Sequence, residues 1–475
     1  MGEQISIKKA TFINFVSKYS TIFIQLILNS ILARLLTPDD YGIVAVVTVF
    51  TGFFTLIADM GIGPAIIQNK SLNDRDIISI FNFTVLTGIV VSMVFGLLSY
   101  PLSLFYNDNV YLPLGVLMSF SILFSVLNIV PNALLLKEKK FKLVGIRTVI
   151  ITVICGMITV ILAYFNFKYY AVVINSILIG LLTFIFNFYS AKIKLHFIIQ
   201  KDSLVKIRGF STYQFAFSFI NYFSRNLDNL LIGKVMGQSA LGYYDKAYKL
   251  MLYPVGNLTH VITPVLHPIL SDYQHDKKYI YEQYRRIVKI LSLLGVFVSV
   301  YCYFAADEAI LIMFGEQWTN SIPTFKILSL TIWAQMIMSS SGTIFQSLGE
   351  TKGLFRAGLI TTTINVIGIV IGLLLGTIES IAFMILLTFS INFIITFIIL
   401  IKMVMGYNVI NFFKMFIPEL GIVLLMSIIL VYVSKLYITN ILISAIVKFI
   451  FASIGYSLGL ILTKQFTYFK LFLKR

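Results

Sequence analysis

Long apolar runs, each about 20 residues in length, recur along the whole chain. An α-helix needs about 20 mainly apolar residues to cross the hydrocarbon core of a bilayer. Few segments alternate between apolar and polar residues, as the strands of a membrane barrel would. The composition agrees, since 58% of the residues are hydrophobic and 12% are charged, whereas soluble domains carry about 25% charged residues. The sequence therefore predicts an all-α polytopic membrane protein.

Charged and turn-forming residues divide these runs into about fourteen predicted transmembrane helices. The predicted spans are residues 11–33, 41–64, 78–100, 112–135, 144–165, 170–190, 213–235, 248–270, 287–306, 322–347, 354–376, 379–401, 411–433 and 441–463.

The distribution of basic residues predicts how these spans are oriented, because cytoplasmic loops retain Lys and Arg. Most of the 37 Lys and Arg residues fall on the same side of the membrane as the N-terminus. The opposite side holds Arg34, Lys168, Lys234, Lys246, Lys249 and Lys435. Both termini are therefore expected in the cytoplasm. The same asymmetry accounts for the net charge of +17 through contact with anionic membrane lipids, with no nucleic acid partner.

The two halves of the chain resemble each other at a fixed spacing. A shift of 200 residues aligns Phe15 with Phe215, Phe23 with Phe223, Asn29 with Asn229, Arg34 with Lys234, Gly42 with Gly242, and Pro64 with Pro264. A shift of 212 residues aligns Leu136, Glu138 and Lys140 with Leu348, Glu350 and Lys352. We expect a six-helix bundle in residues 1–200, a second in residues 201–405, and two additional helices in residues 406–475. Because each bundle has an even number of spans, the repeat is parallel, and its pseudo-twofold axis follows the membrane normal.

Polar side chains form one stripe on the first span and another on the seventh. The stripes consist of Asn14, Lys18, Thr21, Gln25 and Asn29, and of Gln214, Ser218, Asn221, Arg225 and Asn229. Spacings of three and four residues place each stripe on one face of its helix. We expect the two faces to border a central polar cavity.

Arg225 lies near the middle of the seventh span, where an unshielded charge costs roughly 2.5 to 3.5 kcal/mol. One interpretation is that it pairs with Asp228 within the helix and that the amides of the stripes bond neighbouring helices. The other is that Arg225 faces a polar cavity used by a substrate. The sequence leaves both open.

Five further residues near these helices allow two interpretations each. Arg34 and Lys234 end the first and seventh spans, and Lys246 and Lys249 follow nearby. These four are either solvated loop charges or a basic rim that suits an anionic headgroup. Asp59 is the only acid in the second span after its first turn, and it is either a polar contact or a carboxylate that couples transport to an ion. Asp228 is the other candidate for ion coupling.

Several stretches of the chain resemble the polysaccharide-transport branch of the MOP flippase superfamily. They are ARLLTPDDYG at residues 33–42, DMGIGPAIIQ at 59–68, NYFSRNLD at 221–228, LGYYDKAY at 241–248 and FGEQW at 314–318. This branch includes colanic acid and teichuronic acid exporters and is related to O-antigen flippases, which act in lipopolysaccharide synthesis, and to lipid II flippases and MATE antiporters.

The resemblance implies a MATE-like fold and a bacterial inner-membrane flippase. Such a protein moves an undecaprenyl-diphosphate-linked oligosaccharide to the periplasmic leaflet by alternating access. The positions that would bind substrate are Arg225, Asn229, Gln25, Asn29 and Asn221, with Arg34 and Lys234 at the outer rim. The last two helices would hold the lipid tail. No catalytic residue, metal site or cofactor is expected, H⁺ or Na⁺ is a candidate coupling ion, and a monomer is self-sufficient.

Two other functions compete with this one. A drug or ion antiporter of the same fold would favour a more acidic cavity, and the fold alone does not exclude it. A membrane polysaccharide polymerase or ligase would need a large loop outside the membrane, whereas the longest predicted loops, near residues 191–212 and 271–286, are short. We therefore expect a transporter, not an enzyme.

Overall fold

The computed structural model describes residues 7–193, 196, 199–259, 270 and 273–468. Every element in this part of the chain is helical, as predicted. Large apolar side chains lie exposed along the outer faces of the helices, with Leu97 77% and Leu374 81% accessible. Outward-facing apolar surface of this kind suits lipid as a solvent. The protein is a multi-pass membrane protein.

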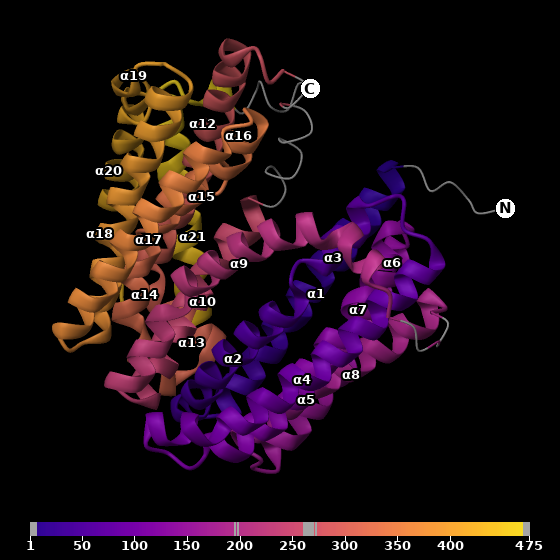
Figure 1. The fold of residues 1–475 in the computed structure, drawn as a ribbon. Helices are drawn as coiled ribbons and strands as arrows, with labels where there is room; N and C mark the ends of the chain where they lie inside the picture. The colour runs from indigo at the N-terminus through magenta and orange to yellow at the C-terminus, as the bar shows by residue number, and fades with distance from the viewer. Residues whose placement is uncertain (1–6, 194–195, 197–198, 260–269, 271–272, 469–475) are drawn as a thin grey trace. The chain divides into compact units, whose positions relative to one another are not determined.

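The chain divides into two compact units, Met1–Gly242 and Tyr243–Arg475. The first contains α1 (Ile7–Leu35), α2 (Pro38–Asp59), α3 (Ile62–Gln68), α4 (Asp74–Tyr106), α5 (Tyr111–Leu127), α6 (Ile129–Lys137), α7 (Phe141–Tyr164), α8 (Tyr169–Ala191), α9 (Lys201–Val235) and the first turn of α10 (Gln238–Thr259). Within it, α4 lies along α5 and α1 lies along α7 (Figure 1). α9 packs against α2, α3 and α4.

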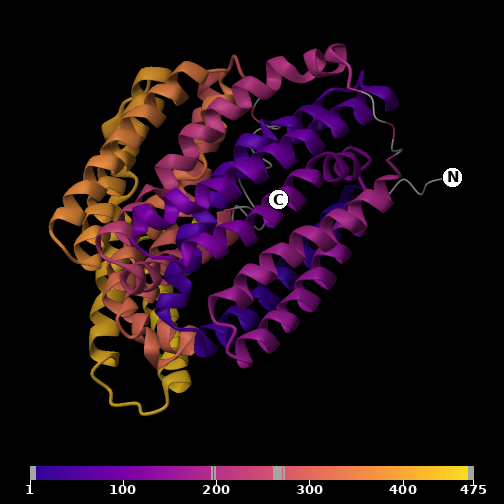
Figure 2. The same ribbon diagram turned by 60° about the horizontal axis from the view of Figure 1, so that its bottom comes forward.

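The second unit contains the rest of α10, α12 (Lys277–Phe304), α13 (Ala306–Phe314), η1 (Glu316–Trp318), α14 (Ser321–Ser329), α15 (Ile332–Met338), α16 (Ser341–Ser347), α17 (Thr351–Leu374), α18 (Ile378–Phe397), η2 (Ile398–Val404), α19 (Val409–Lys414), α20 (Ile417–Val433) and α21 (Ile441–Leu462). α17 packs along α18. α20 and α21 lie side by side, joined by a short loop, and are drawn in the yellow tones of Figure 2.

The predicted boundary at residue 200 is the point where the sequence repeat begins again. The boundary of the compact units, after Gly242, is instead set by which helices pack together. α9 therefore falls in the first unit, although the repeat would make it the first helix of the second bundle. The parallel relation of two six-helix bundles remains a prediction.

Eleven helices of the described chain are long and apolar enough to span a membrane, or twelve if the bent pair Ser321–Ser329 and Ile332–Ser347 forms one span. Each of them corresponds to one of the fourteen predicted spans. The other two predictions, 213–235 and 248–270, coincide with α9 and α10. These helices carry several charged residues, which lowers their hydropathy, and part of the second prediction lies outside the described residues. The count of fourteen stays a prediction.

Two predicted spans are broken in the middle. Span 112–135 is divided at Asn128 into α5 and α6, and span 322–347 bends by 48° between α14 and α15 and is interrupted again before α16. The Thr331 hydroxyl donates to Leu328 O at 2.6 Å, and the Ser340 hydroxyl donates to Ile337 O at 2.8 Å. Such side-chain bonds to the helix backbone compete with its regular hydrogen bonds. Short polar residues thus explain the breaks in span 322–347, which hydropathy alone did not indicate.

Candidate functional site

Residues that begin α2 and α10 meet at one end of the first unit. Thr37 and Asp40 form a capping box at α2. Pro38 occupies the first turn, where the backbone N–H that proline lacks would have no acceptor within the helix. The Ser239 hydroxyl donates to Asp39 Oδ1 at this crossing. The helices begin close enough for their backbones to touch.

The contact depends on two glycines that the 200-residue shift aligns. A Cβ added to Gly42 would lie closer than 3.0 Å to the carbonyl group of Gln238. A Cβ added to Gly242 would lie closer than 3.0 Å to the carbonyl group of Pro38. Pro38 and Gln238 are also 200 residues apart, so the two halves of the contact are reciprocal. The arrangement follows the register of the predicted repeat.

The predicted residues of α1 lie on a helix whose main partner is α7. Gln25 is exposed and Asn29 is half-buried. The Arg34 guanidinium is exposed and donates to Ser30 O at 2.9 Å and to Ser30 Oγ at 2.6 Å. Arg34 is thus steadied by its own helix, and its charge stays accessible at the end where α2 begins.

The predicted residues of α9 differ sharply in exposure. Arg225 is exposed, Asn229 is half-buried, and the Asp228 carboxyl is buried and accepts from the backbone N–H of Asn229 at 2.9 Å. None of the ion pairs formed by the described residues joins Arg225 to Asp228. The side chain of Asn221 lies outside the described part. α1 and α9 have different main neighbours, so a common cavity between their polar faces remains a prediction.

Lys234, predicted at the outer rim, is exposed and bound to α4. Its ammonium donates to Phe105 O and lies 4.8 Å from the centre of the Phe105 ring. This cation–π contact and hydrogen bond hold the end of α9 against the end of α4. Lys234 and Arg34 are therefore exposed charges with defined hydrogen-bond partners, and a basic rim for an anionic headgroup stays a prediction.

Asp59 lies in a pocket of about 540 Å³ inside the first unit, which we call the Asp59 pocket. Its walls come from α2, α3, the end of α5, α6 and one residue of α9, Tyr222. The polar residues that line it are Thr55, Asp59, Ser125, Asn128, Asn132 and Tyr222. The Asp59 carboxyl accepts a long hydrogen bond, 3.4 Å from Gly63 N, and also interacts with the backbone of Gly61. A carboxylate has about four acceptor positions, so some acceptor capacity remains for the pocket.

A chain of directed hydrogen bonds leads from a buried arginine to this pocket. The Arg147 guanidinium donates to Asn187 Oδ1, and both side chains are buried. Asn187 Nδ2 in turn donates to Asn128 Oδ1 at 2.7 Å and to Asn132 Oδ1 at 3.4 Å. We call these four residues the Arg147 chain.

Sequence reasoning did not single out the Arg147 chain. Arg147 falls near the start of the predicted span 144–165, and nothing in the sequence shows that α7 buries its guanidinium. The one available signal was the spacing of Asn128 and Asn132, which places two amides on one face of an apolar segment. Asn187 is more than 50 residues away in sequence, and only packing brings it to that face.

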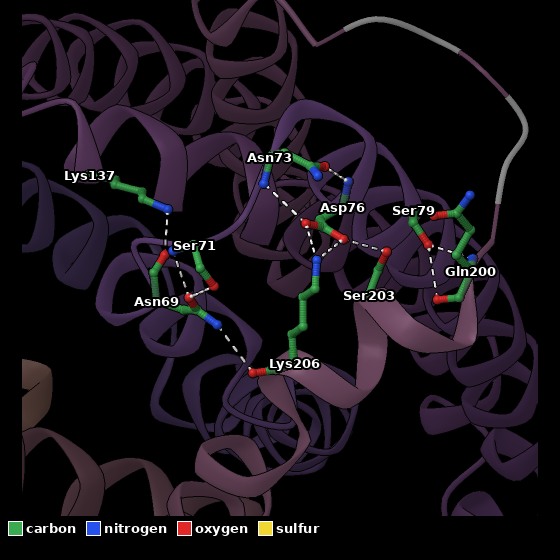
Figure 3. A network of polar contacts seen from close by, with 9 residues as sticks. All are labelled: Asn69, Ser71, Asn73, Asp76, Ser79, Lys137, Gln200, Ser203 and Lys206. Carbon is green, nitrogen blue, oxygen red and sulfur yellow. Dashed lines mark hydrogen bonds and ion pairs between the residues drawn. The ribbon is translucent and has the colours of Figure 1, made fainter.

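A polar network fixes the other end of α9 to the first unit (Figure 3). The Asp76 carboxylate caps α4 with Asn73, and it accepts from Ser203 Oγ at 2.8 Å and from Lys206 Nζ at 2.7 Å. Lys206 O accepts from Asn69 Nδ2 at 3.2 Å. Figure 3 shows these groups converging from the loop before α4 and the first turns of α4 and α9. The network ties the first turns of α9 to the start of α4 and to the loop before it.

Two buried ion pairs attach the last two helices to the second unit. Lys289 Nζ of α12 lies 2.8 Å from Glu419 Oε1 of α20. Lys448 Nζ of α21 lies 2.6 Å from Glu308 Oε1 of α13. Buried ions of this kind persist only when each partner is neutralised. α20 and α21 therefore belong firmly to the second unit.

Comparison with known proteins places this geometry in a family. The family model described as polysaccharide biosynthesis protein matches residues 31–323. An uncharacterized membrane protein in the cps region of Klebsiella pneumoniae is 22% identical over 92% of each chain. The lipopolysaccharide biosynthesis protein WzxC of Escherichia coli strain K12 is 24% identical over 74% of this chain and 72% of its own.

Among solved structures, a lipid II flippase MurJ in an inward closed conformation superposes with a TM-score of 0.76. The alignment covers 97% of this chain and all of that one, at 14% sequence identity. At that identity the likeness shows the fold, which confirms the predicted MOP fold.

Proposed function

The chain belongs to the polysaccharide biosynthesis protein family, and on that premise we propose that it is a flippase. Its substrate is an oligosaccharide repeat unit linked to undecaprenyl diphosphate, which it moves across the bacterial inner membrane by alternating access. Dragging a charged, sugar-bearing headgroup through hydrocarbon unaided would be prohibitive. A protein path lined with polar groups removes most of that barrier.

The exposure of Arg225 is the observation that carries this proposal. The residue lies in the middle of the predicted seventh span, and its side chain is exposed on α9. A guanidinium facing lipid at that depth would cost roughly 2.5 to 3.5 kcal/mol or more. Arg225 therefore faces water or a ligand, and its five donors suit diphosphate oxygens.

Other residues complete the proposed path. We assign the substrate headgroup to the following side chains: Arg225, Asn229, Asn221, Gln25 and Asn29, with Arg34 and Lys234 at the periplasmic rim. Asp228 is a candidate for coupling to H⁺ or Na⁺, and Asp59 is a candidate for coupling to H⁺. The lipid tail lies against α20 and α21, the protein acts as a monomer, and both termini are cytoplasmic.

The reciprocal contact of Gly42 and Gly242 then lies at the periplasmic end, where it closes the path. Small residues let the two helix starts meet without side chains between them. Its opening would release the headgroup to the periplasmic leaflet.

The proposal is tested in a strain lacking the gene, complemented with wild type, with Arg225→Ala, or with Arg75→Ala as control. Arg75 is also exposed, but it lies in the first turn of α4 and outside the proposed path. Arg225→Ala removes a charge-assisted contact, so we expect surface polysaccharide to fall at least tenfold at a normal level of the protein. Arg75→Ala should leave the amount of surface polysaccharide unchanged.

The location of the lipid-linked glycan decides between functions. Repeat units that accumulate in the cytoplasmic leaflet support a flippase. Single repeat units stranded in the periplasmic leaflet would identify a polymerase or ligase instead, and normal surface polysaccharide with Arg225→Ala would disprove the headgroup role.

A further inference from the structure

The Arg147 chain determines which atoms Asn128 and Asn132 present to the Asp59 pocket. An arginine side chain only donates, so Asn187 must turn its Oδ1 toward Arg147. Asn187 Nδ2 then points the other way and occupies the Oδ1 atoms of Asn128 and Asn132. The Nδ2 groups of those two residues are left as the atoms available to the pocket they line.

The pocket consequently combines donors and an acceptor of known identity. Asn128 and Asn132 supply amide N–H donors on one side, and the Asp59 carboxyl supplies acceptors on another. The Tyr222 hydroxyl donates to Val49 O, so it is held in place. The pocket volume of about 540 Å³ falls within the range of ordinary small-molecule sites.

This arrangement disfavours both kinds of ion. A hard cation such as Na⁺ or Ca²⁺ needs several oxygen ligands, but the amide oxygens of Asn128 and Asn132 each already accept a hydrogen bond from Asn187. An anion would meet the Asp59 carboxylate in the same pocket. A neutral ligand with hydroxyl groups that both donate and accept satisfies all of these groups at once.

The pocket residues are confined to the first unit. Under the 200-residue shift Asp59 corresponds to Thr259, and under the 212-residue shift Asn128 and Asn132 correspond to Ser340 and Ile344. The Ser340 hydroxyl donates to a nearby backbone carbonyl, Ile337 O, at 2.8 Å. A feature of the shared scaffold would be expected in both copies, so the pocket has a specific purpose.

We propose that the Asp59 pocket binds a saccharide unit of the substrate, with Asn128 and Asn132 donating to sugar hydroxyls and Asp59 accepting from them. This inference rests on the proposed function and assigns the sugar to a place separate from Arg225, which holds the diphosphate. The pocket thereby makes transport depend on the glycan and not only on the lipid diphosphate.

The test compares two lipids on the full-length protein in nanodiscs. One probe is the lipid-linked oligosaccharide purified from the producing cells, and the other is undecaprenyl diphosphate without sugar. The variant is Asn132→Leu, because Asn128 still accepts the shorter bond from Asn187. Asn365→Leu is the matched control, since it removes a half-buried amide of α17 that bonds Asn392 at 2.8 Å and lies outside the pocket.

Loss of one hydrogen bond to a neutral group predicts a threefold to tenfold weaker affinity of Asn132→Leu for the oligosaccharide lipid. Its affinity for undecaprenyl diphosphate should stay within twofold of wild type, and Asn365→Leu should bind both lipids as wild type does. Asn132→Thr, which restores a donor, should recover part of the loss. If Asn132→Leu itself fails to fold, Asp59→Asn provides the comparison of the two lipids.

Equal weakening toward both lipids, or none toward either, would overturn the saccharide site while leaving the flippase intact. Wild-type protein that binds neither lipid would overturn the proposed function itself. A third outcome concerns cations. If Na⁺ stabilised the wild-type protein more than K⁺ did, and Asn132→Leu abolished this difference, the pocket would be a cation site and the inference would be wrong.

Discussion

The reciprocal glycine contact gives a prediction about Gly242→Ala. The new methyl carbon would lie closer than 3.0 Å to the Pro38 carbonyl group, whereas ordinary van der Waals contact begins near 3.4 Å. The obstacle is backbone, which cannot rotate away as a flexible side chain would. The starts of α2 and α10 must therefore separate.

Overpacking of this kind typically costs about 1 to 3 kcal/mol. Because a backbone group is involved, we expect the upper part of that range. If the contact closes one state of the transport cycle, that energy lowers the population ratio of closed to open contact by about 5-fold to 150-fold. Gly42→Ala should have the same effect, since its methyl would meet the Gln238 carbonyl group.

A cross-linking assay measures the contact directly. Asp39→Cys and Ser239→Cys place two thiols where the native side chains are hydrogen-bonded, after Cys155 and Cys302 have been replaced by Ala. The pair should cross-link readily in the parent protein and far more slowly once Gly242→Ala is added.

Gly256→Ala is the matched control, because Gly256 lies in the same helix and an added Cβ there meets nothing within 4 Å. If Gly242→Ala cross-links at the rate of Gly256→Ala, the glycines do not set this contact. The structural basis of the proposed gate would then be wrong.

Two further predictions concern stability. Lys289→Met leaves the Glu419 carboxyl buried without its cation, which should destabilise the protein by about 3 to 5 kcal/mol. Thermal unfolding in detergent measures this, and the double variant Lys289→Met with Glu419→Gln should lose less stability than Lys289→Met alone. Asp76→Ala removes part of the cap of α4 and the partner of Lys206. We expect the free energy of unfolding to fall by about 1 to 2 kcal/mol, with earlier proteolysis near the start of α9. Asp74 is exposed, so Asp74→Ala should change neither the stability nor the proteolysis.

The sequence by itself determined the class of fold, because the length and hydropathy of a membrane span are local properties. It also indicated where charge would be unusual, since Arg225 and Asp228 interrupt the otherwise uncharged middle of the seventh span. The aligned positions Gly42 and Gly242 pointed to a repeat, and the structure places both in one reciprocal contact.

Tertiary structure decided the rest, because the partners of a buried polar group depend on how helices rotate against one another. Arg147 lies near the start of a predicted span, but only the structure shows that it is buried in α7 and that Asn187 joins it to amides from another helix. A window of sequence contains no information about that rotation. Only the packed bundle brings Asp59, Asn128 and Asn132 to the wall of one pocket, and only there do these separate residues form one site.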